Sequence, residues 1–221
     1  MSTDRLLEQF FSYASSSLKI CGITRAQDAF DLCEHGVTGI GINFWPQSKR
    51  YCSPSEALTF APQIQGKILR VGVFVNATEA EVLTCFENNL IDVAQFHGDE
   101  SPAFLQQFQN HNCPFIRAIG ITEHGELPEI SRIPTPYLLL DAHAPGVYGG
   151  TGKTIDWDFA KTFINEHPEH SVMLAGGITP KNAKAAADLV KPCALDLASG
   201  AESSPGIKDF DKVKAIQKEL S

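Results

Sequence analysis

The sequence predicts an α/β protein in which one (β/α)8 TIM barrel accounts for almost the whole chain. Eight short apolar runs recur along it; they are too short for helices, and most are apolar on both faces, as buried parallel strands are. Helical patterns with their own start signals lie between these runs, and such alternation indicates a parallel sheet with helical crossovers. Eight strand–helix units in about 200 residues fit the small end of the barrel's size range, whereas an open doubly wound sheet usually has fewer strands.

The elements can be placed along the chain in order. The predicted strands begin at Leu18, Gly39, Lys67, Val93, Phe115, Tyr137, Val172 and Ala194. Helix starts are indicated where a hydroxyl residue precedes proline or pairs with Glu or Gln three positions later, at Thr24, Ser53, Thr78, Ser101 and Thr179. The fifth helix, over residues 126–131, is weakly signalled because Pro128 interrupts it. Residues 1–17 form an N-terminal extension whose pattern allows a helix over LLEQFF covering the bottom of the barrel, and residues 18–221 form the (β/α)8 barrel itself.

Composition and charge exclude several classes of function. The net charge of −8 gives the 221-residue chain no general attraction for nucleic acid or an anionic membrane. No run reaches the roughly 18 apolar residues of a membrane span, and the N-terminal segment, with Asp4 and Glu8, is a poor signal peptide. The six cysteines are scattered without a Cys-x-x-Cys pair, which argues against zinc and against a disulfide framework. We therefore expect a cytoplasmic protein that uses no metal and acts on a small molecule.

Two residues become candidate catalytic groups because the active site of this fold lies at the carboxyl ends of the strands. Cys21 ends the first strand, in LKICGIT, where an inert core cysteine is the alternative. A free thiol has a pKa of about 8.5, so ionisation at neutral pH needs nearby positive charge, some of which Arg50 could supply. Asp141 ends the sixth strand, in YLLLDA; aspartate is rarely buried without a partner, and partial desolvation would make it a usable general acid.

Glycine-rich loops near the last strands predict a phosphate site, because backbone N–H groups at a helix N-terminus bind anions without lysine. Phosphate often binds after strands seven and eight of this barrel. The loop residues are Gly176, Gly177, Ser199 and Gly200, with Gly149, Gly150 and Gly152 of GGTG placed to close over the same ligand. Ordinary turn chemistry is the alternative for each glycine.

Other polar residues at the strand ends complete the predicted pocket. Gln95 points away from Phe96 and toward the barrel lumen, while His97 is interpreted as a structural hydrogen-bonding residue, and Asp196 lies on the eighth strand. Two apparent motifs are rejected. GGTGKT resembles the end of a P-loop, but Val147 stands where that pattern needs glycine. HPEH, at 167–170, has a histidine spacing that suits metal, but it contains proline and lies at the opposite end of the barrel.

The motifs together carry a resemblance to a known family. KICGIT, SKRY, VGVFVN, QFHGDE, LLLDA, GGTGKTIDW, LAGGITPKN and DLASGAESSPGIKD occur in the order and spacing of phosphoribosylanthranilate isomerases, so the chain resembles that family from Lys19 to its C-terminus. The resemblance implies a monomeric or homodimeric barrel of tryptophan biosynthesis. It implies an Amadori rearrangement of N-(5-phospho-β-D-ribosyl)anthranilate to 1-(2-carboxyphenylamino)-1-deoxy-D-ribulose 5-phosphate, with no cofactor.

The resemblance also implies roles for single residues. Cys21 matches the general base, Asp141 the general acid, and Arg50 the group that binds the anthranilate carboxylate. The loops at 149–152, 176–177 and 199–200 match the phosphate site, and Asp196 matches an aspartate near the reacting sugar. The chain departs from the family pattern at Ala198, where a small hydroxyl or amide residue is common, at Lys49, where proline is usual, and at Asn43 and Trp45, in a stretch that is commonly more apolar.

Two other functions stay open from the sequence alone. The related aminoaldose isomerase of histidine biosynthesis performs the same chemistry, but it usually has an aspartate where Cys21 stands. A non-catalytic phosphosugar-binding barrel would keep the glycine loops without needing both Cys21 and Asp141.

Overall fold

The predicted barrel is closed in a computed structural model of the chain, which describes residues 1–13, 16–121, 129–142 and 155–220. Strand β1 pairs in parallel with both β2 and β8, and this pairing excludes the open sheet. Every predicted strand is present. The strands are β1 (Ser17–Cys21), β2 (Gly39–Asn43), β3 (Leu69–Phe74), β4 (Val93–Phe96), β5 (Phe115–Ile121), β6 (Tyr137–Ala142), β7 (Ser171–Leu174) and β8 (Ala194–Leu197).

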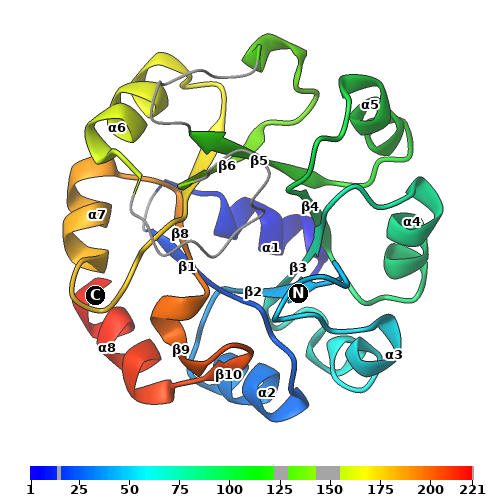
Figure 1. The fold of residues 1–221 in the computed structure, drawn as a ribbon, viewed down its shortest axis with the longest axis horizontal. Coiled ribbons are helices and arrows are strands. Elements are labelled where there is room, and N and C mark those ends of the chain that lie inside the picture. The colour runs from blue at the N-terminus through cyan, green and yellow to red at the C-terminus, as the bar shows by residue number, and fades with distance from the viewer. Residues whose placement is uncertain (14–15, 122–128, 143–154, 221) are drawn as a thin grey trace.

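Helices surround the barrel on its outer side (Figure 1). The crossover after β5 contains only a short 3₁₀ turn among its described residues, in line with its weak sequence signal. An additional hairpin lies between β8 and the last helix. The elements are α1 (Thr3–Phe10), α2 (Ala26–Glu34), α3 (Pro54–Ala57), η1 (Ala61–Ile64), α4 (Glu79–Glu87), α5 (Pro102–Asn110), η2 (Ile130–Arg132), α6 (Trp157–Glu166), α7 (Ala183–Val190), η3 (Ser199–Ala201), β9 (Glu202–Ser204), β10 (Ile207–Lys208) and α8 (Phe210–Leu220).

Three of the five predicted helix caps are confirmed, and two are wrong. Ser53 and Thr78 form complete capping boxes, and the Ser101 hydroxyl accepts a hydrogen bond from the Phe104 N–H. The Thr24 hydroxyl instead donates to the Gly206 carbonyl at 2.7 Å, so α2 begins without a side-chain cap. The Thr179 hydroxyl donates to the Asn182 side chain in a turn that precedes α7. The turn at Gly206 thus takes the Thr24 hydroxyl, whereas the Thr179 hydroxyl is taken by the side chain of Asn182, the residue that directly precedes α7.

Apolar side chains fill the lower part of the barrel and separate it from the helices. Alternate residues of each strand point outward, where Ile20 and Ile40 pack beneath the helices. The inward residues include Val71, Leu139 and Met173, which form a buried cluster inside the barrel. Polar inward residues lie nearer the carboxyl ends of the strands, so the apolar cluster forms a floor beneath the candidate site.

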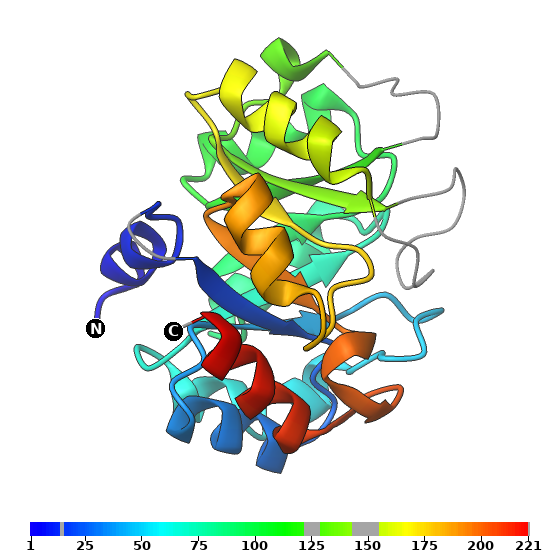
Figure 2. The ribbon, with the colours of Figure 1, turned by 90° about the vertical axis from the view of Figure 1, so that its left-hand side faces the viewer.

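The N-terminal helix α1 covers the end of the barrel opposite the strand carboxyl ends (Figures 1 and 2). Its Leu6, Leu7 and Phe10 are buried and belong to the cluster inside the barrel. A Cβ atom at Gly39, the first residue of β2, would lie 2.6 Å from the Phe10 ring. The helix therefore packs directly against the amino ends of the strands, where a side chain at Gly39 would displace it.

Replacement of Phe10 with alanine is expected to lower the free energy of unfolding by about 3–5 kcal/mol, because its ring is 1% exposed and fills the base of the barrel. Urea denaturation measures this loss. Glu8→Ala, on the exposed side of the same helix, serves as the control and should change stability by less than about 0.5 kcal/mol. A loss below about 1 kcal/mol for Phe10→Ala would show that α1 adds little to the core.

Candidate active site

Cys21 lies at the carboxyl end of β1, with its sulfur against the backbone of β2. A Cβ atom at Gly41 would lie 2.5 Å from the Cys21 sulfur, so glycine leaves the space that the thiol occupies. Burial raises the pKa of the Cys21 thiol, while the positive charges of Lys19 and Lys208 act in the opposite direction. The charge of the Cys21 thiolate also raises the pKa of Arg50, so Arg50 interacts with the thiol as expected, and Lys19 and Lys208 add positive charge that the sequence did not predict.

Lys19 is the residue that sequence reasoning missed beside the thiol. It lies two positions before Cys21, so both side chains point into the barrel. Its fully buried amine donates to the Gln95 side-chain oxygen at 2.9 Å and to Asp196 at 3.0 Å. Burial alone would lower the pKa of Lys19, but the charges of Asp196 and Cys21 outweigh it and raise that pKa. A lysine within the apolar run LKIC was the feature of the sequence that could have indicated a buried charge beside Cys21.

Asp141 ends the inward row of β6 and is 7% exposed. The His97 Nε2 atom lies 3.2 Å from its carboxylate, close enough for an ion pair but without the alignment of a hydrogen bond. The other ring nitrogen of His97 lies 3.3 Å from the Gln95 amide nitrogen. Asp196, Lys19, Gln95, His97 and Asp141 thus form one continuous polar row across the barrel, which joins the surroundings of the predicted base to the predicted acid.

The loops after β7 and β8 lie against each other. Gly176 has a φ of +85°, and a Cβ atom there would lie 3.2 Å from an Asp141 carboxylate oxygen. Any side chain at Gly200 would collide with the Ile178 carbonyl. The structure therefore brings the 176–177 and 199–200 loops together beside Asp141, with Ser199 at the start of η3. The third predicted loop, with Gly149, Gly150 and Gly152, lies outside the described residues.

Arg50 projects from the loop after β2 toward the hairpin β9–β10. Its side chain crosses Gly22, where a Cβ atom would collide with it, and Gly22 also requires its φ of +79°. The guanidinium binds Glu202 side-on, with Nε and Nη2 donating to the carboxylate at 2.7–3.0 Å. Lys208 donates to the same carboxylate at 2.7 Å and to the Cys21 carbonyl at 2.6 Å. Sequence reasoning quoted the segment that carries Glu202 and Lys208 but assigned them no role.

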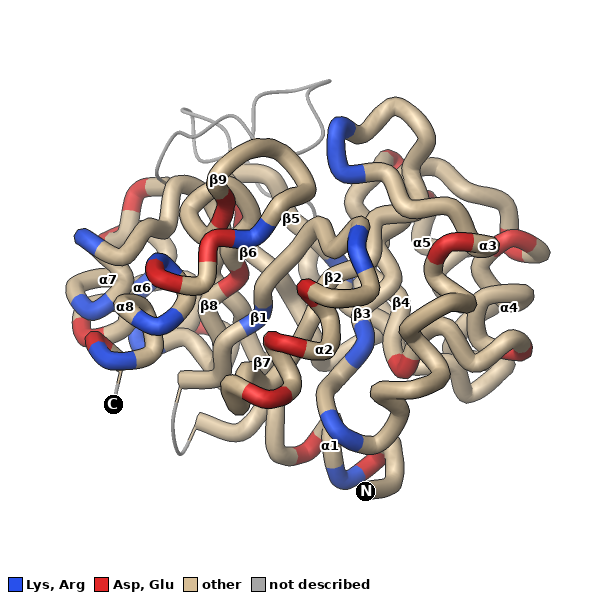
Figure 3. The backbone as a smooth tube through the Cα atoms, turned by 90° about the horizontal axis from the view of Figure 1, so that it is seen from below, with Lys and Arg blue, Asp and Glu red and all other residues tan. Residues whose placement is uncertain are grey.

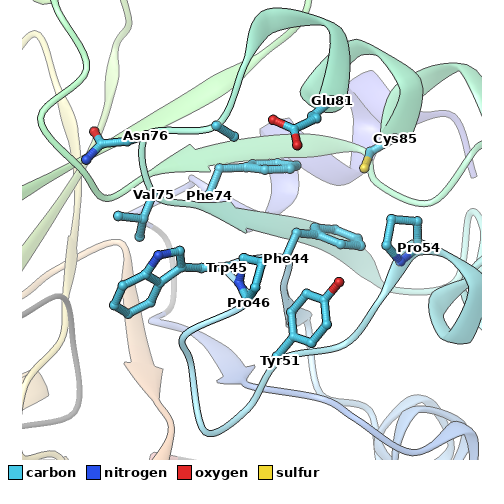
Figure 4. A pocket seen from close by; sticks show the side chains of 11 residues that line it. Phe44, Trp45, Pro46, Tyr51, Pro54, Phe74, Val75, Asn76, Glu81 and Cys85 are labelled. Atoms are coloured by element: carbon cyan, nitrogen blue, oxygen red, sulfur yellow. The ribbon is translucent and has the colours of Figure 1, made fainter.

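Aromatic residues hold the loop that carries Arg50. The Asn43 side chain accepts the Trp45 N–H at 2.9 Å, and the rings of Phe44 and Phe74 stack with centroids 5.3 Å apart. A cavity of about 230 Å³ lies between these rings and the first turn of α4. Figure 4 shows the side chains that line it. None of the predicted site residues lines this cavity. Asn43 and Trp45, which depart from the family pattern, thus shape the turn that leads to Arg50.

The described ranges contain no cluster of three or more His, Cys, Asp or Glu side chains suited to a metal ion. The helices that the structure describes are also all too short or too polar to cross a membrane.

Acidic and basic segments lie beside one another near β9 (Figure 3). The hairpin is therefore a place where opposite charges compensate each other rather than a patch of one sign.

Replacement of Lys19 with methionine is expected to raise the pKa of the Cys21 thiol. The change removes the main positive charge that lowers this pKa, and it leaves Asp196, whose charge raises it. If turnover requires the thiolate, the ascending limb of kcat/KM against pH moves to higher pH. Thiolate absorbance near neutral pH should fall in parallel. An unchanged limb in a folded Lys19→Met variant would show that Lys19 does not tune the thiol.

Comparisons with known proteins agree with the barrel fold and indicate one enzyme family. A family model described as N-(5'-phosphoribosyl)anthranilate (PRA) isomerase matches residues 18–219. N-(5'-phosphoribosyl)anthranilate isomerase of Azotobacter vinelandii is 36% identical over 204 residues, covering 91% of this chain and 96% of the relative. The crystal structure of phosphoribosyl anthranilate isomerase from Thermus thermophilus superposes with a TM-score of 0.80 at 36% identity, covering 92% and 98% of the two chains.

A further solved structure is similar to this chain and carries a ligand. It is a phosphoribosyl anthranilate isomerase in complex with reduced 1-(o-carboxyphenylamino)-1-deoxyribulose 5-phosphate. The two chains share 29% identity with a TM-score of 0.75, over 93% of this chain and 98% of the other.

Proposed function

Because this chain belongs to the N-(5'-phosphoribosyl)anthranilate isomerase family, we propose that Cys21 is the base and Asp141 the acid of its reaction. The chain is an aldose–ketose isomerase of tryptophan biosynthesis. The observation that carries the two roles is their placement. Cys21 and Asp141 lie at the carboxyl ends of β1 and β6, three strands apart around one barrel mouth, and a polar row links their surroundings.

The two groups account for the rearrangement of N-(5-phospho-β-D-ribosyl)anthranilate. Asp141 gives its proton to the ring oxygen while the bond from that oxygen to C1′ breaks, and the nitrogen lone pair forms an iminium. The iminium acidifies the proton on C2′, which the Cys21 thiolate removes to give an enolamine. The enolamine takes a proton at C1′ and loses its hydroxyl proton, which leaves the ketone. General acid and general base catalysis each contribute about 10²–10⁴-fold.

The remaining predicted residues bind the two anionic ends of the substrate. Arg50 is placed to meet the carboxylate, and Gly176, Gly177, Ser199 and Gly200 offer backbone N–H groups to the phosphate. Gly149, Gly150 and Gly152 are proposed for the same phosphate on the family resemblance alone. Other members of the family commonly have a hydroxyl or amide side chain at the position of Ala198. Because alanine has no hydrogen-bond donor, a backbone N–H group or a water molecule makes the corresponding phosphate contact in this chain.

Asp196, Gln95 and His97 belong to the pocket in this proposal. Gln95 is 1% exposed, with its amide held between Lys19 and His97, so it supports the pocket from below. Asp196 has one carboxylate oxygen on Lys19, and it lies near the reacting sugar by resemblance. Residues 18–221 form the catalytic domain, residues 1–17 form an extension that covers its base, and the enzyme acts in the cytoplasm as a monomer or homodimer.

A comparison of two substrates tests the proposed function. Freshly prepared phosphoribosylanthranilate and the aminoaldose substrate of the histidine pathway are offered to the purified chain. We expect loss of anthranilate fluorescence with the first substrate and no product from the second. Enzymes that catalyse the second reaction usually have an aspartate as the base where this chain has Cys21. Turnover of the histidine-pathway substrate alone, or phosphate binding without turnover of either, would contradict the assignment.

A further inference from the structure

We propose that Glu202 is a positioning residue for substrate binding, which fixes the Arg50 guanidinium so that its remaining donors face the carboxylate of the substrate. The inference rests on the proposed role of Arg50 and deepens it. Glu202 is the first residue of β9, far along the chain from the loop that carries Arg50.

The hydrogen bonds define the orientation of the guanidinium. Arg50 donates to both Glu202 carboxylate oxygens through Nε and Nη2, an arrangement that fixes the plane and the rotation of the group. Within the described residues, Nη1 donates no hydrogen bond. A planar guanidinium held along one edge presents its other donors in a fixed direction. Arg50 is therefore held in one orientation in which it can bind a second carboxylate, and it does not sample several rotamers.

The burial of the cluster makes the orientation rigid. The side chain of Glu202 is 3% exposed and that of Lys208 is fully buried, while the Arg50 side chain keeps 16% of its surface exposed. Burial opposes the ionisation of Glu202, but Arg50 and Lys208 outweigh it and hold its pKa below the usual range. One anion between two cations leaves a net charge of about +1, which suits a substrate with a single carboxylate at this end.

The hairpin connects this orientation to the predicted base. Glu202 also accepts the Gly206 N–H at 3.1 Å, so the turn between β9 and β10 helps to hold its carboxylate. Lys208 of β10 bridges Glu202 and the Cys21 carbonyl. A plain barrel would pass from β8 straight to its last helix. Here the inserted hairpin fixes the carboxylate-binding arginine and the end of β1 to one another.

Two variants separate orientation from charge. Glu202→Gln removes the negative charge, which by charge alone should strengthen the attraction of Arg50 for an anion. Glu202→Asp keeps the charge but withdraws the carboxylate by one methylene, which breaks the side-on pairing. If Glu202 acts by orientation, both variants should lose about ten- to hundredfold in kcat/KM, mainly through KM. Glu202→Asp keeps the negative charge beside Lys208, so it should leave the pH profile that the thiol sets unchanged.

The decisive control is a substrate without the carboxylate, the N-(5-phosphoribosyl) derivative of aniline. The parent and both variants should turn it over at similar rates. Arg50→Ala combined with Glu202→Gln should be no worse than Arg50→Ala alone, because the two residues act as one unit. Asp92→Asn, which disrupts a similar side-on pair with Arg70 at the far end of the barrel, should leave KM unchanged in the folded protein.

Three results would overturn the proposal: unchanged KM in both Glu202 variants, tighter substrate binding by Glu202→Gln, or equal losses with the carboxylate-free substrate. Calorimetry with reduced 1-(o-carboxyphenylamino)-1-deoxyribulose 5-phosphate provides a readout that does not depend on turnover. The Glu202 variants should bind this compound more weakly than the parent. An inactive parent would therefore contradict the proposed function, whereas an active parent with unaffected variants would contradict only the role of Glu202.

Discussion

Turnover is expected to collapse when Cys21 is replaced by alanine, while the barrel stays folded. Alanine has no ionisable group to remove the C2′ proton, so kcat should fall by at least about 10²-fold. The structural cost is small, because the change removes a single atom that packs against Gly41, worth about 1 kcal/mol. Steady-state kinetics gives the loss in kcat, and thermal unfolding checks that the variant is folded.

Cys33→Ala is the matched control for this prediction. Cys33 is a partly exposed thiol on α2, outside the barrel, and burial raises its pKa as burial raises that of Cys21. The same atom is removed, so any general effect of losing a thiol should appear equally in both variants. We expect the parental kcat for Cys33→Ala. Parental kcat in Cys21→Ala would remove the thiol from the mechanism.

Asparagine in place of Asp141 is expected to abolish ring opening and therefore turnover. The side chain keeps its size, so the close packing against Gly176 and the contact with His97 persist, but the amide has no acidic proton to give the ring oxygen. The expected fall in kcat is about 10²–10⁴-fold with KM little changed. Steady-state kinetics measures both constants.

Asp188→Asn provides the comparison for the acid. Asp188 lies on α7, where it forms an exposed ion pair with Lys184. Unlike Asp141, it is neither buried nor at the end of a barrel strand. The same change of carboxyl to amide there should leave both kinetic constants at their parental values. A kcat for Asp141→Asn within a factor of about ten of the parent would exclude it as the essential acid.

The elements of the barrel could be predicted because each depends on local sequence. Apolar runs indicate the strands. The capping boxes at Ser53 and Thr78 start their helices through hydrogen bonds between residues three positions apart. Thr24 failed as a cap for the opposite reason: its hydroxyl bonds to Gly206, 182 residues away. A pattern of neighbours in sequence cannot report a partner that the fold supplies.

The same distinction divides the candidate site. Cys21 and Asp141 could be proposed because the fold class alone places strand ends at the active site. A role for Lys19 could not be predicted, because its buried charge is compensated by Asp196. Asp196 lies 177 residues later in the chain and is adjacent to Lys19 only in the closed barrel. Glu202 likewise acquires a role only when the loop after β2 reaches the hairpin after β8.

The most direct test of the account is the loss of anthranilate fluorescence when freshly prepared phosphoribosylanthranilate meets the parent, Asp141→Asn and Cys21→Ala in one experiment. The account predicts rapid loss with the parent and none above the buffer rate with either folded variant. No loss with a folded parent, or parental loss with either variant, would contradict the pairing of this acid with this base.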